Sequence, residues 1–328
     1  RVAVGGWGLR RLRSLLEHGH SRAGSIRYVV KTLNKHHVPL PPHLRPSVWR
    51  ALLLAESDAE PLYRCQRLQS RVVADGTTLE RMRDVSRQLS LDLPRCHPYS
   101  AALGRASSRR CLASVLQAWA AGGEEEGRRY WQGLDSVAAV AVLVFGQEHV
   151  AWSVLERITH RFLRDYLVEG VKSCLPAHMG VVAQMLAFLD PTLGLHLTTN
   201  HVLPDMYAVS WILPLLTHTY PIDRPQDLHS IYPLWDILMC TSSPFPLFVV
   251  VAMLILNRDK ILQLDMHGLI ALLSSFPPPA PAPLGALALR LYDETPAMLY
   301  DWALEPPFHE PTVSAWRYAR RRKRSEAA

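Results

Sequence analysis

Hydrophobic residues recur along this chain at the spacing of an α-helix. In four separate segments, apolar side chains lie three or four residues apart, so each set shares one helical face. The sets are Ile26, Val29, Val30 and Leu33; Leu112, Val115, Leu116 and Trp119; Ala151, Leu155, Ile158 and Phe162; and Val182, Met185, Leu186 and Leu189. Neither strand-like alternation nor a hairpin signal accompanies them. The pattern predicts an all-α fold with roughly a dozen or more helices, and the lack of a fixed repeat argues against a solenoid.

Two longer apolar runs, Val137–Phe145 and Leu247–Leu256, are too short to cross a bilayer, and we expect both to form buried helices. Breaks between helices are visible as well. The glycine-bounded stretch at 122–127 and the charged stretch at 223–227 are typical of loops, and the proline-rich stretch at 276–283 predicts a stiff linker.

Composition narrows the class of protein. The chain has 328 residues, enough for one large domain or two lobes, and its net charge is +7. Because it begins at Arg1, we expect it to be cut from a longer protein. Five widely spaced cysteines with no CxxC pair favour a reducing compartment over a disulfide framework or zinc ribbon. No P-loop, HExxH or GxSxG motif is present, no leader opens the chain, and the histidines at 18–20 and 36–37 lack the spacing of a metal site.

The stretch LDLPRCHPY, residues 91–99, holds one arginine between two prolines. Pro94 fixes its own φ and disfavours the α region for Leu93, so Arg95 is expected at a helix end or in a loop. Asp92 lies three residues earlier, within reach of the guanidinium. Taken alone, these residues also fit a surface turn with a local ion pair.

The stretch YWQGLDS, residues 130–136, places Gln132 and Gly133 directly before the apolar helix that begins near Leu134. A helix N-terminus suits anionic groups because its free N–H groups and its dipole point outward. Taken alone, this stretch is better explained by a plain helix-start motif.

Several motifs occur together in a recognisable order. The first motif is LRPSVW (44–49). It is followed by LSLDLPR, which has the pattern IxxDxxR, and then by YWQG, which has the pattern YxQG. The segment 204–218 and LWD (234–236) come last. This ordered set resembles the TBC domain of Rab GTPase-activating proteins over roughly residues 40–300. Four segments are most similar to the TBC domain of the kinase-like TBC proteins: DLPRCH, YWQGLDS, LWDILM and SSPFP.

The resemblance implies an organisation and a core. We expect a flanking segment at 1–20, a two-lobed helical TBC domain at 21–310 with lobes of approximately 21–170 and 171–310, and a basic tail at 311–328. A Rab-binding groove is expected between the lobes. Trp211 and Trp235 are expected in the core.

The resemblance also implies a mechanism. Arg95 matches the family's arginine finger and Gln132 its glutamine finger, which together accelerate GTP hydrolysis in a GTP-bound Rab protein. The expected supporting residues are Asp92, which would orient Arg95, and the motif residues Tyr130, Gly133, Arg45, Trp49 and Asp236. We expect the domain to bind no cofactor or metal of its own, since the GTP and Mg²⁺ belong to the Rab. We expect the domain to be cytoplasmic and to lie at the periphery of secretory, endosomal or ciliary membranes.

Departures from the family pattern leave alternatives open. Cys96 stands where the family usually has threonine, and Asp135 and Ser136 follow QGL where the family often has Asn-Asp after QGM. These departures put the rate and the choice of Rab in doubt, whereas the intact Arg95 and Gln132 favour activity. The alternative function is a non-catalytic Rab-binding or scaffolding module, and an unrelated helical adaptor is a weaker alternative. The basic run Arg320–Arg324 could contact anionic lipid or be a solvated end. Nucleic acid is not an expected partner, because no aromatic platform accompanies the run.

Overall fold

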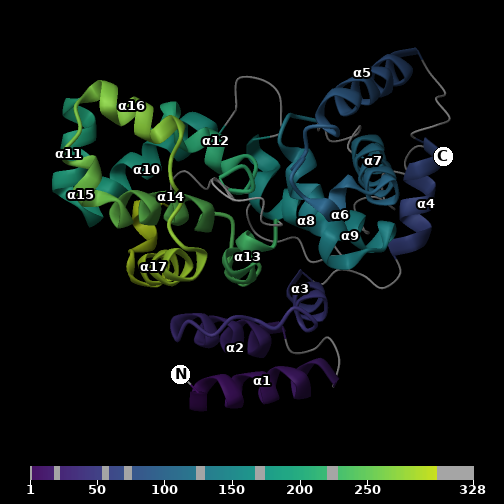
Figure 1. The fold of residues 1–328 in the computed structure, drawn as a ribbon, viewed down its shortest axis with the longest axis horizontal. Coiled ribbons are helices and arrows are strands. Elements are labelled where there is room, and N and C mark those ends of the chain that lie inside the picture. The colour runs from purple at the N-terminus through teal and green to yellow at the C-terminus, as the bar shows by residue number, and fades with distance from the viewer. Residues whose placement is uncertain are drawn as a thin grey trace.

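The computed structural model describes residues 2–17, 23–53, 59–69, 76–122, 130–166, 174–219 and 228–300. Within these ranges the regular structure is helical, with seventeen α-helices, short 3₁₀ and π segments and no strand (Figure 1). The predicted all-α fold of a dozen or more helices is confirmed. None of the described helices combines the length and apolar character needed to cross a bilayer.

The first part of the chain forms a helical hairpin, a short helix and a compact group. The hairpin and the short helix are α1 (Val2–Glu17), α2 (Ala23–Lys35) and α3 (Arg45–Leu53). The group comprises α4 (Ala59–Gln69), α5 (Gly76–Asp92), α6 (Ala101–Gly104), α7 (Ala106–Gly122), α8 (Leu134–Phe145) and α9 (Glu148–Ile158), which continues as a π-helical turn, η3 (Thr159–Leu163), and a 3₁₀ turn, η4 (Arg164–Tyr166). The predicted flanking segment therefore contains α1, which packs on α2.

The second group lies beside the first in Figure 1. It comprises α10 (Leu175–Leu189), α11 (Pro191–Thr199), η5 (Pro204–Met206), α12 (Ala208–Ile212), η6 (Leu228–Ile231), α13 (Tyr232–Leu238), α14 (Phe245–Leu256), α15 (Arg258–Ile261), α16 (Met266–Ser274), α17 (Pro281–Glu294) and η7 (Ala297–Leu299). Figure 1 shows α13 between the two groups, which are the two lobes. Several predicted features lie outside the described residues: the lobe boundary at 170, the loops at 123–127 and 223–227, and the basic tail.

The helical periodicity in the sequence corresponds to buried faces. All four apolar residues chosen in α2 are buried, and the two long apolar runs form the buried helices α8 and α14. Trp211 and Trp235 are in the core as expected. The proline-rich linker is shorter than predicted, because Pro281 already begins α17. Proline is tolerated there since the first turn of a helix needs no N–H donor.

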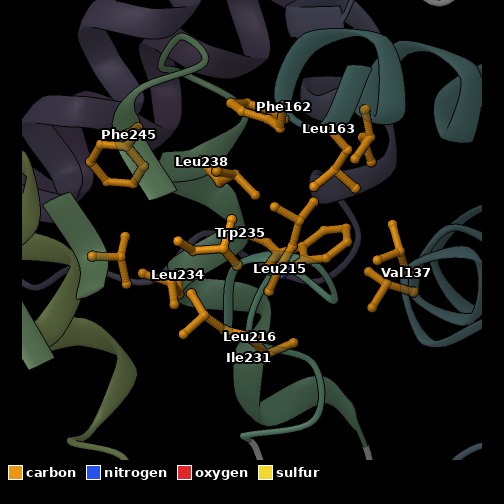
Figure 2. Close-up of a cluster of buried hydrophobic side chains, with 14 of the residues drawn as sticks. Val137, Phe162, Leu163, Leu215, Leu216, Ile231, Leu234, Trp235, Leu238 and Phe245 are labelled. Atoms are coloured by element: carbon orange, nitrogen blue, oxygen red, sulfur yellow. The ribbon is translucent and has the colours of Figure 1, made fainter. Parts of the chain in front are cut away.

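A hydrophobic cluster joins the two lobes. Figure 2 shows Val137 of α8 and Phe162 of η3 around the same core as Trp235 of α13 and Phe245 of α14. Residues of the segment that follows α12 complete it, including Leu215. Such contacts across the lobes bury apolar area that neither lobe could cover alone, which stabilises their relative position.

The segment after α12 has an unusual backbone. Leu215 and Leu216 both have positive φ values, 45° and 66°. Non-glycine residues rarely adopt this left-handed conformation, which costs about 1–2 kcal/mol per residue. Both leucines are buried, and the indole Nε1 of Trp235 donates to the carbonyl oxygen of Leu215 at 3.2 Å. Packing and this hydrogen bond hold the strained turn in place.

A buried ion pair connects α3 to α13. Arg45 donates from Nε and Nη2 to the two carboxylate oxygens of Asp236 at 2.8 and 3.0 Å. The indole Nε1 of Trp49 donates to the same carboxylate at 2.7 Å, and Arg45 Nη2 also donates to the carbonyl oxygen of Leu40 at 2.9 Å. Both charged side chains are almost wholly buried. This fork-to-fork geometry is the strong, directional form of a carboxylate–arginine contact.

Removing the carboxylate of Asp236 should destabilise the whole domain. Asp236→Ala leaves the buried guanidinium of Arg45 unpaired, and such a change typically costs about 3–5 kcal/mol of unfolding free energy. Urea denaturation followed by far-UV circular dichroism measures this loss.

Lys35→Ala provides a matched control. Its ammonium pairs with Asp293 at 3.0 Å, but both side chains are substantially exposed. An exposed pair contributes at most about 1 kcal/mol, so this variant should unfold close to the wild type. Equal losses in the two variants would contradict the structural role given to Asp236.

Candidate functional site

A pocket of about 240 Å³ lies where the connection from α5 to α6 meets the start of α8. Its lining comes from residues 92–99, from residues 132–136 and from Thr217 and His218 in the segment that follows α12. Three stretches far apart in the sequence therefore build one concave surface. Arg95 and Gln132, singled out in two separate stretches, line this same pocket.

Arg95 lies beyond the end of α5, as the neighbouring proline predicted. Helix α5 ends at Asp92, and the backbone N–H of Arg95 donates to the carbonyl oxygen of Asp92 at 3.1 Å. The guanidinium donates from Nε and Nη2 to Asp92 Oδ1 at 3.2 and 2.5 Å. The Arg95 side chain is 56% exposed, whereas that of Asp92 is 1% exposed. A buried carboxylate thus anchors an exposed guanidinium.

Asp92 accepts hydrogen bonds from three side chains. Besides Arg95, Gln88 donates from Nε2 to both oxygens at 3.1 and 3.2 Å, and the hydroxyl of Tyr130 donates to Oδ2 at 2.8 Å. Burial alone would raise the pKa of Asp92, but the hydrogen bonds from Arg95, Gln88 and Tyr130 outweigh it and hold the pKa below its usual value. Asp92 is therefore a fixed negative charge that orients Arg95.

Gln132 lies on the turn that starts α8. Its side chain is exposed, while Gly133 behind it is buried. Gly133 has φ 107°, a left-handed conformation that glycine adopts without strain. Its N–H donates to Asp135 Oδ1 at 3.0 Å, which fixes the turn from within the helix. This geometry explains why a glycine follows the glutamine.

Asp135 and Ser136, two of the departures from the family pattern, lie beneath the pocket. Both are buried, and the hydroxyl of Ser136 is 2.7 Å from Nε2 of His218. The thiol of Cys96, a third departure, is buried beside them. Burial and the neighbouring carboxylate of Asp135 raise the pKa of the Cys96 thiol, which stays protonated at neutral pH. Cys96 can therefore donate to Asp135, as a threonine hydroxyl would.

Two histidines form the adjoining wall. The rings of His97 and His218 are 6.2 Å apart, and Nδ1 of His97 is 2.6 Å from the hydroxyl of Tyr99. Burial and then His218 lower the pKa of His97 to about 4, and burial lowers that of His218 as well. Both rings are neutral at pH 7. Sequence reasoning missed this pairing, because His218 lies more than 100 residues after His97.

The remaining predicted residues lie in different places. Tyr130 reaches the pocket only through Asp92. Arg45, Trp49 and Asp236 are absent from the pocket lining and form the buried contact between α3 and α13 instead. Gln88 was not singled out from the sequence, although its position four residues before Asp92 on a helix places the two side chains on one face. Among the described residues, no cluster of three metal-binding side chains occurs.

Comparison with known proteins places the chain among relatives. Residues 42–262 match the model of the Rab-GTPase-TBC domain family. The TBC domain-containing protein kinase-like protein of Gallus gallus is 32% identical over 241 residues, which cover 73% of this chain and 25% of that protein. The Rab GTPase-activating protein eat-17 of Caenorhabditis elegans is 24% identical over 233 residues, which cover 70% of this chain and 24% of that protein. This chain thus spans about a quarter of the length of these relatives.

A solved structure has the same fold. The crystal structure of the Ypt/Rab-GAP domain of Gyp1p superimposes with a TM-score of 0.67 at 19% sequence identity, covering 86% of this chain and 93% of that one. The resemblance predicted from the ordered motifs, including that to the kinase-like proteins, is confirmed. The chain belongs to the Rab-GTPase-TBC domain family.

Proposed function

We propose that this domain accelerates GTP hydrolysis by a Rab-family GTPase, with Arg95 and Gln132 supplied in trans. The observation that carries the proposal is that both side chains are exposed at one pocket, while the groups that orient them are buried. Membership of the family, and the names of eat-17 and of the Gyp1p domain as Rab GTPase-activating, support it.

Arg95 would stabilise the charge that develops on the transferred phosphoryl group. Two of its nitrogens donate to Asp92, which leaves Nη1 and a further Nη2 proton to donate to phosphate oxygens. Because Asp92 already fixes the guanidinium, less side-chain entropy is lost when it enters the nucleotide site. Pro94 restricts the backbone in the same way.

Gln132 would orient the water that attacks the γ-phosphate. A side-chain amide both donates and accepts, so it can bind the water and the phosphate oxygens together.

In this proposal the GTP and the Mg²⁺ belong to the Rab, and the domain contributes no cofactor of its own. The partner is the GTP-bound Rab, and the place of action is the cytoplasmic side of secretory, endosomal or ciliary membranes.

Arg95→Ala should reduce the stimulation of GTP hydrolysis by roughly 10³- to 10⁵-fold, since this is the usual effect of removing an arginine finger. Arg95→Lys should not restore the rate, because an ammonium lacks the planar fork of donors. Single-turnover GTP hydrolysis, on a Rab that responds to the wild type, measures both.

Arg87→Ala is the matched control for Arg95→Ala. Arg87 is also exposed on α5 and also pairs with an aspartate three residues earlier, Asp84, at 3.0 Å, but it does not line the pocket. It should retain full stimulation. A folded Arg95→Ala protein that stimulates hydrolysis at the wild-type rate would refute the assignment of Arg95 as the arginine finger. If the wild-type domain binds a Rab stably but does not stimulate hydrolysis, the non-catalytic binding module is favoured.

Gln132→Ala should also lower the stimulated rate sharply, because the attacking water loses the group that orients it. The loss in the double variant Arg95→Ala/Gln132→Ala should be smaller than the sum of the two single losses in free energy, since both residues serve one transition state. The same single-turnover measurement applies. Fully additive losses would indicate that the two residues act in separate steps.

Tyr130→Phe tests the anchoring of Arg95. The change removes only the hydroxyl that donates to Asp92 and keeps the ring. A hydrogen bond to a charged group contributes about 1.5–3 kcal/mol, so we expect a rate about ten times lower at saturating Rab, with little change in Rab affinity. A loss of affinity with an unchanged maximal rate would show that Tyr130 contacts the partner instead.

A further inference from the structure

The N-terminal part of the chain carries an uneven charge. Residues 1–53 contain eight arginines and two lysines but a single acidic residue, Glu17. The whole chain, in contrast, has 36 basic and 29 acidic residues. Residues 1–53 therefore carry a net charge of +9, whereas the rest of the chain, with 26 basic and 28 acidic residues, is nearly neutral.

Part of this positive charge is used inside the fold. Arg45 pairs with the buried Asp236, and Lys31 and Lys35 both lie within 4 Å of Asp293 on α17. Helix α1 differs. Arg10, Arg11 and Arg13 are exposed, and none of them forms an ion pair with the described residues.

The same helix exposes a tryptophan. Its buried side consists of Gly5, Gly8, Leu12 and Leu15, and it packs on α2. A side chain at Gly8 would collide with Leu33 of α2, so this glycine allows the two helices to approach closely. Trp7 lies on the other side and is 45% exposed. We call this side of α1, with Trp7, Arg10, Arg11 and Arg13, the outer face.

Helical spacing distributes these four side chains over the half of α1 that faces away from α2. Arg10 and Arg11 follow Trp7 by three and four residues, so both lie next to it on the helix surface, and Arg13 follows Arg10 by three. Figure 1 shows α1 at the margin of the molecule, with α2 between it and the lobes and with α5 at the opposite margin. Because the buried side of α1 packs on α2, the outer face is directed away from α5, the helix after whose end Arg95 lies.

We propose that the outer face of α1 binds the surface of a membrane that contains anionic lipid. Arginine side chains near such a surface are attracted by its negative potential and donate to lipid phosphates. Tryptophan is enriched at the interface between water and hydrocarbon, where its apolar ring and its N–H are both accommodated. A helix whose exposed side carries arginines beside a tryptophan can therefore lie against such a surface.

The shape of the face favours a membrane over an acidic protein. A protein partner usually takes up a tryptophan in a fitted pocket, and its charges match single arginines in fixed positions. A lipid surface requires only that the cations and the ring lie on one convex side, which is what the single helix provides. The proposal does not depend on GTPase activation, because the outer face shares no residue with the pocket.

The test is co-sedimentation of the full chain with vesicles of phosphatidylcholine alone or with 30% phosphatidylserine. Each basic side chain near an anionic surface contributes about a factor of five in partitioning. The triple variant Arg10→Gln/Arg11→Gln/Arg13→Gln should therefore bind the anionic vesicles about a hundredfold more weakly. Trp7→Ala should weaken binding several-fold, and its effect should persist at high salt, whereas that of the arginines should fade.

A control variant carries the same change in net charge elsewhere. Arg83→Gln/Arg87→Gln/Arg110→Gln removes three exposed arginines from α5 and α7, and it should bind like the wild type. Far-UV circular dichroism checks that each variant is folded. Equal losses in both triple variants would overturn the proposal, because net charge alone would explain them. Undiminished binding by the α1 variant would also overturn it and point to another basic segment, such as Arg320–Arg324. Absence of vesicle binding by the wild type would overturn it too, leaving the face to an acidic protein.

Discussion

The buried contact between Arg45 and Asp236 fixes the helix on which the rest of the structure depends. Burying two charges is costly, and it is tolerated here because the guanidinium fork, the indole of Trp49 and the carbonyl of Leu40 satisfy them together. The contact holds α13 against α3, and the two paired residues are 191 positions apart in the chain. Since α13 lies between the two lobes, its position sets how the lobes meet.

The consequences of this contact reach the pocket through Trp235, the residue before Asp236. Trp235 lies in α13, and its indole N–H donates to the carbonyl oxygen of Leu215. Leu215 belongs to the segment that also contains Thr217 and His218, which line the pocket. His218 in turn contacts Ser136, in the first turn of the helix that follows Gln132. A continuous set of contacts thus links Asp236 to the glutamine turn. Arg45, Trp49 and Asp236 do not line the pocket, but they stabilise its wall indirectly because they fix the position of α13.

The sequence predicted what depends on local spacing. Helices with a regular apolar face were recognisable, as was the loop position of Arg95, because proline restricts the backbone of its neighbours in any fold. The wall formed by His97 and His218 could not be predicted, because it depends on how two distant segments pack. The same holds for Arg45, whose motif position gave no indication that it pairs with Asp236 of α13. Gln88 was predictable in principle, since its contact with Asp92 spans one helical turn.

The strained turn at Leu215 and Leu216 shows how packing selects residues against backbone preference. Glycine would relieve about 1–2 kcal/mol of strain at each position, less about 0.5–1 kcal/mol for the greater entropy of glycine in the unfolded chain. Loss of either leucine side chain from the cluster in Figure 2 would cost about 2–5 kcal/mol, which exceeds that gain. The chain therefore keeps an unfavourable backbone to retain a filled core. Relatives that vary here are expected to exchange one large apolar side chain for another and to avoid glycine, even though the backbone geometry alone would favour it.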